Sequence, residues 1–397
     1  MKTPASAKNK STRAGNPRRL LLAVNQLESF FNHRMPLAHA AKTTGWDVHI
    51  AIHEAGEARE IARKSGINDL TFHHWPLARS FASPARETET LRALNGLVAA
   101  IQPDIVHAFT LKPALYAALV SRWRRQPTVM SITGVGSFFL GQGLKERLIR
   151  AGLTTALRLA LGSTRQIAIV QNPDDQQLVR RQFAMREDHI VLIPGSGVDL
   201  TRFAPAPELA PPPVQIVLAA RMLADKGVRE FAQAAHILKD RGLNARFVLA
   251  GGLDPANRTA ISEAELRQWQ AQGDVTWLGQ VADMAQLYRQ SHIACLPSYR
   301  EGLPKSLLEA AACGLPCVTT DVPGCRDIVV HEKTGLLVPA RDAKNLAEAL
   351  ERLIEHAPER QHFGSAGRQM VERGYSNEAI SAAILETYAR LLANQPA

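Results

Sequence analysis

Two glutamates, Glu301 and Glu309, lie close together in the stretch Ser298–Pro316, which reads SYREGLPKSLLEAAACGLP. A turn separates them, because Gly302 and Pro304 interrupt regular structure ahead of a run of good helix formers. One carboxylate is therefore expected on a loop and the other inside the helix that follows. Both can accept hydrogen bonds from the hydroxyl groups of a sugar.

The helix expected over 306–313 begins next to that turn. Its first free N–H groups, near Lys305 and Ser306, point back at the loop, and such a terminus favours an anion, above all a phosphate. Carboxylates beside an anion site predict a pocket for a nucleotide sugar. The alternative is a capped helix that carries two surface glutamates, since short motifs match many unrelated proteins.

Two basic residues follow the apolar stretch Val214–Ala220: Arg221 comes directly after it, and Lys226 stands further on in ARMLADKG. A guanidinium and an ammonium at the end of a strand can neutralise a leaving diphosphate. The alternative is a pair of solvated residues in a loop. Gly251 and Gly252, at the end of the next expected strand, would let the backbone approach a nucleotide closely.

Polar residues also follow strand-like stretches in the first half of the chain. His107 closes the strand of DIVHAFTLKP, and Lys112 starts the next helix. A strand-end histidine that faces a cleft could orient a hydroxyl group, or it could be a packing residue with satisfied hydrogen bonds. In SITGVGSFF, Gly134 and Gly136 either let the backbone approach an acceptor phosphate or form an ordinary turn.

No two aspartates stand two apart anywhere in the chain, so the Asp-x-Asp pair that would hold a divalent ion on a nucleotide diphosphate is missing. This predicts a transfer that needs no metal and no cofactor besides the donor. The cysteines are expected to be core thiols, because no histidine pair completes a zinc site. The four cysteines are Cys295, Cys313, Cys317 and Cys325.

The chain has 397 residues, of which 46% are hydrophobic and 21% charged, and this suits two globular domains. No apolar run approaches the roughly 20 residues that span a bilayer, and the basic start, 1–16, is expected to be a disordered tail. The net charge of +10 suits nucleic acid, an anionic lipid surface or a phosphorylated substrate. Aromatic and basic residues do not interleave as in proteins that stack bases, which argues against nucleic acid.

Apolar stretches of strand length alternate with helical patterns, which predicts an α/β fold with two Rossmann-like, doubly wound parallel sheets. The strands expected in the first half are Leu20–Val24, Val48–Ile52, Thr71–Pro76, Ile105–Phe109, Thr128–Ile132, Ile167–Val170 and Ile190–Ile193. Those of the second half are Val214–Ala220, Arg246–Ala250, Val275–Leu278, Ile293–Pro297, Pro316–Thr320 and Leu336–Val338.

A proline-rich stretch, 204–213 (APAPELAPPP), divides the two series and is expected to be a stiff linker. It separates an acceptor-binding domain over 17–203 from a nucleotide-sugar domain over 214–375. A last helix within 376–397 could cross back onto the first domain. Two such domains leave a cleft between the carboxyl ends of their sheets, where open parallel sheets bind ligands.

Four motifs of the second half, ARMLADKG, VLAGG, YREGLPKSLLEAAACGLP and PGCRDIVVHEKTGLLVP, together resemble the retaining family-4 glycosyltransferases of the GT-B fold. The resemblance covers nearly all of the chain beyond the tail. It implies that Glu301 contacts the donor sugar and Glu309 holds the ribose, while Arg221 and Lys226 bind the diphosphate. It also implies that the turn joins the donor site through Gly302, Leu303, Pro304, Lys305 and Ser306.

SFFNHRMPLAHAA, GVGSFFLGQGLKERLIR and GGLDPANR are similar to bacterial transferases that add N-acetylgalactosamine to undecaprenyl-diphosphate-linked N,N'-diacetylbacillosamine, and to related O-antigen and capsule enzymes. This implies a UDP-sugar donor, a polyprenyl-diphosphate-linked glycan acceptor and peripheral attachment to the cytoplasmic face of the inner membrane. The acceptor-binding residues expected on this basis are Gly134, Gly136, Lys112 and Arg34.

The chain departs from the family at several positions. Phe109 stands where many members carry a second histidine, which weakens a catalytic role for His107. Asp327 replaces a glutamate after the PG turn, and Ser196 replaces the asparagine of an I-P-N-G connector. HAFTLKP is shared with transferases of other sugars, so the donor sugar stays open. Transfer onto lipopolysaccharide core or another lipid, and non-catalytic sensing of sugar nucleotides, remain alternatives.

The stretch Leu140–Gly162 places leucines at helical spacing with basic residues among them. It is either a helix packed on the core or an amphipathic helix that docks on an anionic membrane, where a lipid-linked acceptor resides. The leucines are Leu144, Leu148, Leu153, Leu157 and Leu161, and the basic residues are Lys145, Arg147, Arg150 and Arg158.

Overall fold

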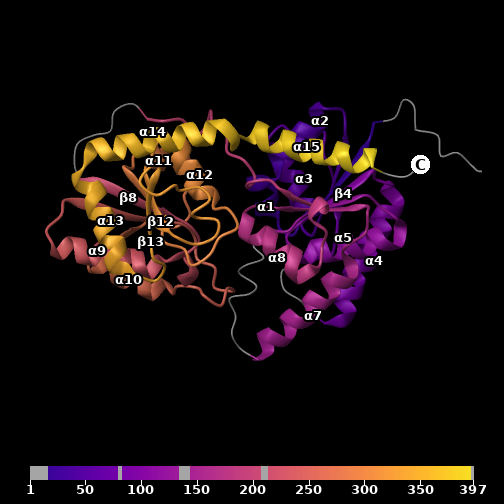
Figure 1. Cartoon of the computed structure of the whole chain (residues 1–397), viewed down its shortest axis with the longest axis horizontal. Helices are drawn as coiled ribbons and strands as arrows, with labels where there is room; N and C mark the ends of the chain where they lie inside the picture. Colours follow the sequence, from indigo (N-terminus) through magenta and orange to yellow (C-terminus); the bar gives the residue numbers. More distant parts are fainter. Residues whose placement is uncertain (1–16, 79–82, 134–143, 207–212, 395–397) are drawn as a thin grey trace, which may run out of the picture.

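The computed structural model describes residues 17–78, 83–133, 144–206 and 213–394. In this part of the chain, two parallel sheets with helices on both faces form two lobes that stand side by side (Figure 1). The strands coincide closely with the apolar stretches of the sequence. The predicted α/β class with two doubly wound parallel sheets is therefore confirmed.

The sheet of the first lobe has the order β3-β2-β1-β4-β5-β6-β7, and that of the second has the order β10-β9-β8-β11-β12-β13. The first sheet consists of β1 (Arg19–Ala23), β2 (Asp47–Ile52), β3 (Thr71–His74), β4 (Ile105–Phe109), β5 (Thr128–Ser131), β6 (Gln166–Val170) and β7 (Ile190–Leu192). The second consists of β8 (Val214–Ala219), β9 (Ala245–Ala250), β10 (Thr276–Trp277), β11 (Ile293–Leu296), β12 (Cys317–Thr320) and β13 (Gly335–Val338).

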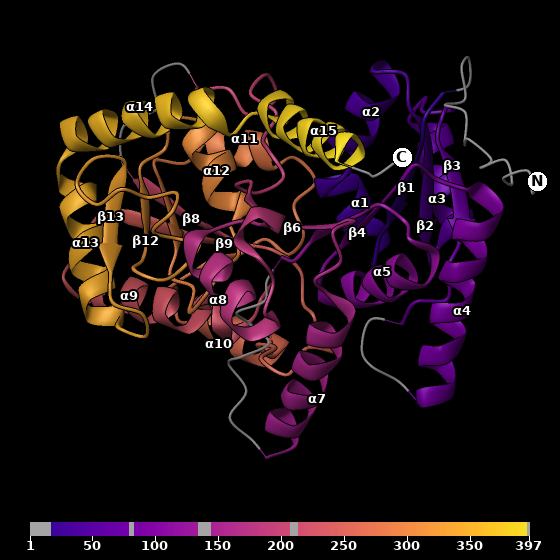
Figure 2. The same ribbon diagram turned by 45° about the vertical axis from the view of Figure 1, so that its right-hand side comes forward.

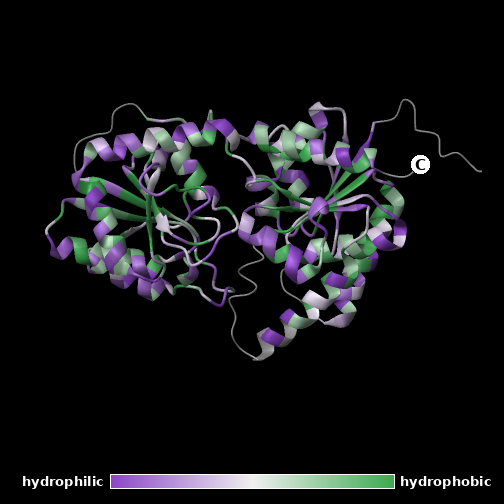
Figure 3. Cartoon of the chain, in the orientation of Figure 1, coloured by the Kyte–Doolittle hydropathy of each residue, from purple (hydrophilic) through white to green (hydrophobic). Residues whose placement is uncertain are grey.

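In each sheet the chain winds outward from a central pair of strands, β1 with β4 in the first lobe and β8 with β11 in the second. Connections on the two sides of such a pair leave toward opposite faces, which opens a crevice at the carboxyl ends of the strands. Figure 3 shows hydrophobic strands at the centre of each lobe, with hydrophilic residues on the outer helices. Each sheet is thus a buried layer whose carboxyl edge is available for ligands.

The helices of the first lobe are α1 (Leu27–His33), α2 (Met35–Thr43), α3 (Ala55–Lys64), α4 (Pro84–Ile101), α5 (Leu111–Arg124), α7 (Leu144–Ala160) and α8 (Pro173–Phe183). After these come α9 (Val228–Asp240), α10 (Glu263–Ala271), α11 (Met284–Arg289), α12 (Lys305–Ala312), α13 (Ala343–Glu355), α14 (Ala357–Gly374) and α15 (Asn377–Ala393). Within the described ranges, none of the helices has both the length and the apolar character that crossing a bilayer requires.

The chain ends with two helices that lie on different lobes, as Figures 1 and 2 both show: α14 on the second lobe and α15 on the first. Ile380, Ile384 and Tyr388 of α15 are buried in the apolar cluster of the first sheet. The Tyr388 ring meets Trp46 edge to face, with 5.8 Å between ring centres. The last helix therefore completes the core of the first lobe.

Two segments pass between the lobes next to each other. The backbone N–H of Val198 donates to the Tyr375 carbonyl at 2.9 Å, and that of Asn377 donates to the Val198 carbonyl at 3.0 Å. Val198 and Phe203 are buried in the apolar cluster of the second lobe. The chain therefore enters that lobe ahead of the proline-rich stretch, of which 207–212 lie outside the described residues.

All four cysteines are buried and none forms a disulfide, so the prediction of core thiols is confirmed. Burial raises the pKa of Cys317 to about 12. A thiol with this pKa stays protonated near neutral pH and packs as a small apolar side chain.

Candidate active site

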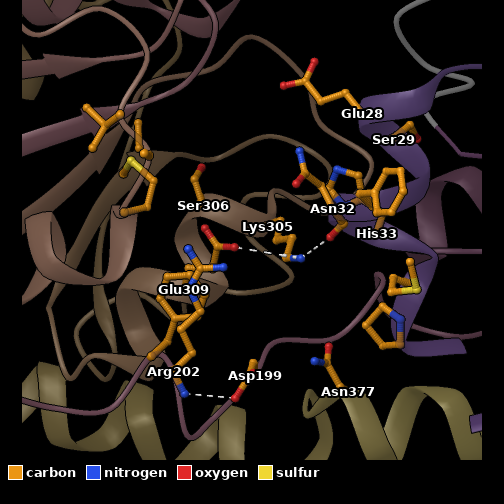
Figure 4. Close-up of a pocket in the computed structure, with 18 of the residues that line it drawn as sticks. Glu28, Ser29, Asn32, His33, Asp199, Arg202, Lys305, Ser306, Glu309 and Asn377 are labelled. Carbon is orange, nitrogen blue, oxygen red and sulfur yellow. Dashed lines mark hydrogen bonds and ion pairs between the residues drawn. The ribbon is translucent and has the colours of Figure 1, made fainter. Parts of the chain in front are cut away.

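A cleft of about 1420 Å³ lies between the carboxyl ends of the two sheets. The second lobe contributes the ends of β8 and β9 and the start of α12, the first lobe contributes α1 and α2, and the start of α15 joins them. Figure 4 shows Lys305 and Glu309 on one side and Asn32 and His33 on the other. The predicted site residues that line the cleft are Arg221, Gly251, Gly252, Lys305, Ser306 and Glu309.

Close backbone packing shapes the second-lobe edge of this site. A Cβ atom on Gly251 would lie 1.7 Å from the carbonyl oxygen of Ala220, so no other residue fits between the ends of β8 and β9. Gly227 has φ of 71°, and a Cβ atom there would lie 2.1 Å from the carbonyl oxygen of Pro297. Gly227 thus lets the residues that follow β8 lie against the loop that follows β11, and Gly251 lets the ends of β8 and β9 lie against each other.

The start of α12 has the features of an anion site. Pro304 is its N-cap residue, and no side chain in the described part of the chain caps the terminus. Lys305 is the first helical residue; its Nζ donates to the carbonyl of Asn32 across the cleft and lies 3.9 Å from Oε1 of Glu309. The helix terminus and one ammonium group thus lie together at the cleft wall.

Glu309 is largely buried in the cleft wall, and this changes its chemistry. Burial raises the pKa of the Glu309 carboxyl to about 7, although nearby Lys305 and Arg202 act in the opposite direction. Near neutral pH the carboxyl therefore titrates. Only its ionised form makes the charge-assisted hydrogen bonds that hold a hydroxyl group firmly.

Glu301 and Lys226 pair with each other. The Lys226 Nζ lies 2.5 Å from Oε1 of Glu301, and the hydroxyl of Ser298 donates to the same oxygen at 2.8 Å. Both charged side chains are mostly buried. They do not line the cleft, nor do the turn residues Gly302, Leu303 and Pro304.

Arg221 lines the cleft with about half of its side chain exposed, and its guanidinium forms an ion pair with Asp254. Asp254 also lines the cleft, and its own side chain is nearly buried. Both basic residues expected to meet a diphosphate are therefore paired with an acidic neighbour. A bound anion would have to compete with these carboxylates.

His107 does not face the cleft, so of its two interpretations the structure agrees with the packing residue and not with the catalytic one. The residue is fully buried, Nδ1 lies 2.5 Å from the hydroxyl of Tyr388, and Nε2 lies 2.8 Å from the hydroxyl of Ser131. Burial also pushes the pKa of its imidazole well below the usual value. Because α15 covers the end of β4, His107 is a neutral packing residue in this structure and has no access to substrate.

Lys112 does not face the cleft either. Its ammonium lies 3.1 Å from Oε2 of Glu87 and donates to the carbonyl of Ala78, and the side chain is almost entirely buried. The lysine joins α5 to the start of α4 rather than presenting a charge to a ligand. In this arrangement the ammonium group points away from the cleft in which an acceptor is expected.

Arg34 is buried beside the cleft. Its guanidinium lies 4.3 Å from the centre of the Phe109 ring, and burial lowers its pKa to about 10. None of the described residues forms a salt bridge with it. Its neighbours His33 and Met35 line the cleft, but Arg34 does not. Gly134 and Gly136, the other expected acceptor residues, lie outside the described residues.

The sequence reasoning missed several residues that line the cleft, among them His33 and Arg202. The pKa of His33 is lowered to about 3 by burial and by its cationic neighbours Arg34 and Lys305, so its ring is neutral at physiological pH. Its Nδ1 lies 3.1 Å from the hydroxyl of Ser196. The available signal was the place of His33 at the end of α1, the helix that follows β1, because β1 lies where the sheet order reverses.

No group of three or more histidine, cysteine, aspartate or glutamate side chains within the described ranges is arranged to hold a metal ion. The cleft wall carries cationic side chains, a helix terminus and the titrating carboxyl group of Glu309, and it also carries the carboxylates of Glu28, Asp199, Asp254 and Glu378. Such a set binds a phosphorylated ligand that carries hydroxyl groups.

Comparison with known families agrees with this geometry. Residues 19–172 match the family described as "Glycosyl transferase 4-like", and residues 213–356 match "Glycosyl transferases group 1". The chain belongs to these glycosyltransferases. The first match covers most of the first lobe, and the second covers the sheet that carries Arg221, Lys226, Glu301 and Glu309.

Individual relatives of this glycosyltransferase are glycosyltransferases as well. It is 27% identical to the N,N'-diacetylbacillosaminyl-diphospho-undecaprenol alpha-1,3-N-acetylgalactosaminyltransferase of Campylobacter jejuni, over 92% of this chain and 97% of the relative. It is 24% identical to the UDP-Gal:alpha-D-GlcNAc-diphosphoundecaprenol alpha-1,3-galactosyltransferase of Escherichia coli, over 68% and 71%. The sucrose-phosphate synthase of Thermosynechococcus elongatus superposes with a TM-score of 0.77 at 19% identity, over 95% and 100%. This last likeness supports the two-lobed GT-B fold.

Proposed function

We propose that the enzyme moves a hexose or N-acetylhexosamine, with N-acetylgalactosamine as the first candidate, from a UDP-sugar to an undecaprenyl-diphosphate-linked saccharide, with retention of the anomeric configuration. The main support is the full-length similarity to the Campylobacter jejuni transferase, together with an anion site and a titrating carboxyl group in one cleft. The Escherichia coli relative also carries a diphosphoundecaprenol acceptor in its name.

The donor would bind along the second lobe. Its diphosphate would lie at the start of α12 and meet Arg221 and Lys226, and its ribose would meet Glu309. For this, Arg221 must leave Asp254 and Lys226 must leave Glu301. The same exchange would free the carboxylate of Glu301 for the donor sugar, so that binding and assembly of the site occur together.

In the transfer, the bond between the anomeric carbon and the β-phosphate oxygen breaks, and a bond to the acceptor hydroxyl oxygen forms on the same face of the sugar. The hydroxyl proton passes to the departing phosphate oxygen, whose charge Arg221, Lys226 and the helix terminus would stabilise. Because these groups supply the positive charge, the proposed transfer uses no metal. Full activity in excess chelator is expected, and a loss that manganese restores would refute this.

The acceptor would bind along the first lobe. Arg34 is the candidate for contact with its diphosphate, because its guanidinium has no salt-bridge partner among the described residues; since it lies behind the cleft wall, its side chain would have to move to reach the ligand. Gly134 and Gly136 remain candidates on sequence grounds. The neutral ring of His33 and the backbone of Asn32 line the path to the donor.

A lipid-linked acceptor requires the enzyme to visit the membrane, and α7 is the proposed docking element. Leu153 and Leu157 of α7, and Leu161 directly after it, pack on the core and are not available to lipid, whereas Leu159 is exposed. Arg147 is exposed, whereas Arg158 donates to the carbonyl of Gln182 at 2.5 Å and so supports α8. Peripheral binding at the cytoplasmic face would therefore rest mainly on charge, at about 1 kcal/mol for each basic residue near anionic lipid, with Leu159 as an apolar contact.

The docking step has a direct test. Changing Lys145, Arg147 and Arg150 to Gln should weaken salt-sensitive binding to anionic vesicles while leaving UDP binding intact, and neutral vesicles serve as the control. If vesicle binding depends neither on the salt concentration nor on these substitutions, α7 is not the docking element.

The transfer itself is tested with a panel of UDP-sugars against two acceptors, an undecaprenyl-diphosphate-linked saccharide and a lipopolysaccharide core. Product on the first acceptor with the anomeric configuration kept supports the proposal. If product forms only on the lipopolysaccharide core, the enzyme belongs to the alternative acceptor class. Donor binding with no release of UDP on either acceptor would indicate a sensor.

A further inference from the structure

The residues on either side of Glu301 are held from the opposite lobe. The side-chain amide of Asn172 donates to the carbonyl of Gly302 at 2.7 Å. The guanidinium of Arg300 donates to the carboxylate of Asp175 at 2.9 Å. Asn172 and Asp175 belong to the first lobe, whereas 300–302 belong to the second.

The first-lobe half of this contact is a specific arrangement at the start of α8. Asn172 is the N-cap residue, and its side-chain oxygen accepts from the backbone N–H of Asp175 at 2.7 Å. The amide nitrogen then donates both to Asp175 Oδ2, at 3.1 Å, and to Gly302. Both side chains are buried almost completely. A serine caps a helix equally well but lacks the second function, a donor that reaches the other lobe.

The second lobe holds the same segment by different groups. The side chain of Glu301 meets Lys226 and Ser298, and its backbone N–H donates to the carbonyl of Pro323 at 3.1 Å. The side chain of Glu301 is therefore held by its own lobe, whereas the main chain around it is held by both lobes. Moving the lobes apart would break both cross-lobe bonds and release the main chain at Arg300 and Gly302 from the first lobe.

We propose that Asn172, Asp175 and Arg300 are positioning residues that set the main chain around Glu301 when the two lobes close. The carboxylate then takes its working geometry only in the closed enzyme, with donor and acceptor both enclosed. This inference rests on the proposed function, since it assigns Glu301 to the donor sugar. None of the three residues needs to touch the reacting atoms.

The central test removes the charge of each partner of the ion pair in turn, and Asp175→Asn does so without changing the shape of the side chain. Asp175→Asn and Arg300→Gln should each lower kcat about 10- to 100-fold, because small misplacements at a reacting centre have effects of this size. The dissociation constant of UDP should change by no more than about twofold, since those contacts come from the second lobe. The double variant should be no slower than either single variant, because the two residues act through one contact.

Asp174→Asn is the matched control. Asp174 is also an acidic residue in the first turn of α8, and it also faces a second-lobe arginine, Arg326, but at 3.9 Å and with both side chains well exposed. Its change should leave kcat unaltered. If Asp174→Asn and Asp175→Asn slow the enzyme equally, the effect belongs to the helix terminus and the proposal fails.

Asn172→Ser separates positioning from folding, because serine keeps the cap and loses the donor to Gly302. The melting temperature should change little while kcat falls. Small-angle scattering of the ligand-free proteins gives a readout that needs no donor: Asn172→Ser and Arg300→Gln should each show a larger radius of gyration than wild type. Equal radii together with wild-type kcat in these variants would overturn the inference. A wild-type protein that transfers no sugar would instead refute the proposed function, and the scattering comparison would still decide the positioning role.

Discussion

Both lobes place basic or titratable side chains at the carboxyl ends of central strands, but they use them differently. In the first lobe, His107 at the end of β4 is fully buried and Lys112 is paired with Glu87. In the second lobe, Arg221 after β8 is half exposed at the cleft. The two lobes differ because α15 packs over the strand ends of the first lobe, where the hydroxyl of its Tyr388 contacts His107. A polar residue at a strand end becomes a site residue only where that edge is left open.

The largest expected effect contrasts two lysines. Lys226→Ala should lower kcat roughly 100-fold or more, the usual scale for losing a group that stabilises charge in a transition state. Lys112→Gln should lower the melting temperature, because it disturbs the buried pair with Glu87, while kcat stays within about twofold. Steady-state kinetics on both variants gives the two kcat values, and thermal denaturation gives the melting temperatures. A wild-type kcat for Lys226→Ala would show that its pairing with Glu301 is purely structural.

A smaller effect concerns the carboxyl group of Glu309. Its raised pKa, about 7, predicts that donor affinity increases as the pH rises from 6 to 8, because only the ionised form binds the ribose strongly. Glu309→Gln should weaken donor binding about tenfold at pH 8 and remove the pH dependence. Calorimetric titration with UDP at several pH values measures both. Glu301→Gln serves as the comparison, since it should lower kcat and leave the affinity for UDP nearly unchanged.

The Glu309→Gln variant should also be more stable than wild type. Unfolded, the Glu309 carboxyl loses its proton near pH 4.5, whereas in the folded protein it keeps the proton to about pH 7, so the free energy of unfolding falls as the pH rises through this range. Glu309→Gln should therefore raise the free energy of unfolding at pH 8 by up to about 3 kcal/mol, and far less at pH 4. Urea titrations at the two pH values measure the difference. Equal stability of wild type and variant at pH 8 would mean that the carboxyl is not desolvated.

The sequence predicted the sheets well because buried parallel strands are continuous apolar runs, and those runs are local. It also identified Arg221, Lys305 and Ser306 as cleft residues from a strand end and a helix start, and Glu309 from its place inside the helix that follows the turn. It failed at His107, because the residue that covers it, Tyr388, lies 281 positions away. The contacts of Asn172 and Arg300 were equally invisible, because they depend on how two lobes face each other.

The smallest effect tests this long-range contact. Tyr388→Phe removes the hydroxyl that meets Nδ1 of His107 and leaves a buried ring nitrogen without that partner. The free energy of unfolding should fall by about 1–3 kcal/mol, while kcat and donor affinity stay at wild-type values. Urea unfolding and steady-state kinetics on one preparation measure both. A different result would be a kcat that falls as far in Tyr388→Phe as in Lys226→Ala while the stability stays unchanged. His107 would then have to act in the reaction, and the contrast between a covered and an open strand end would not hold.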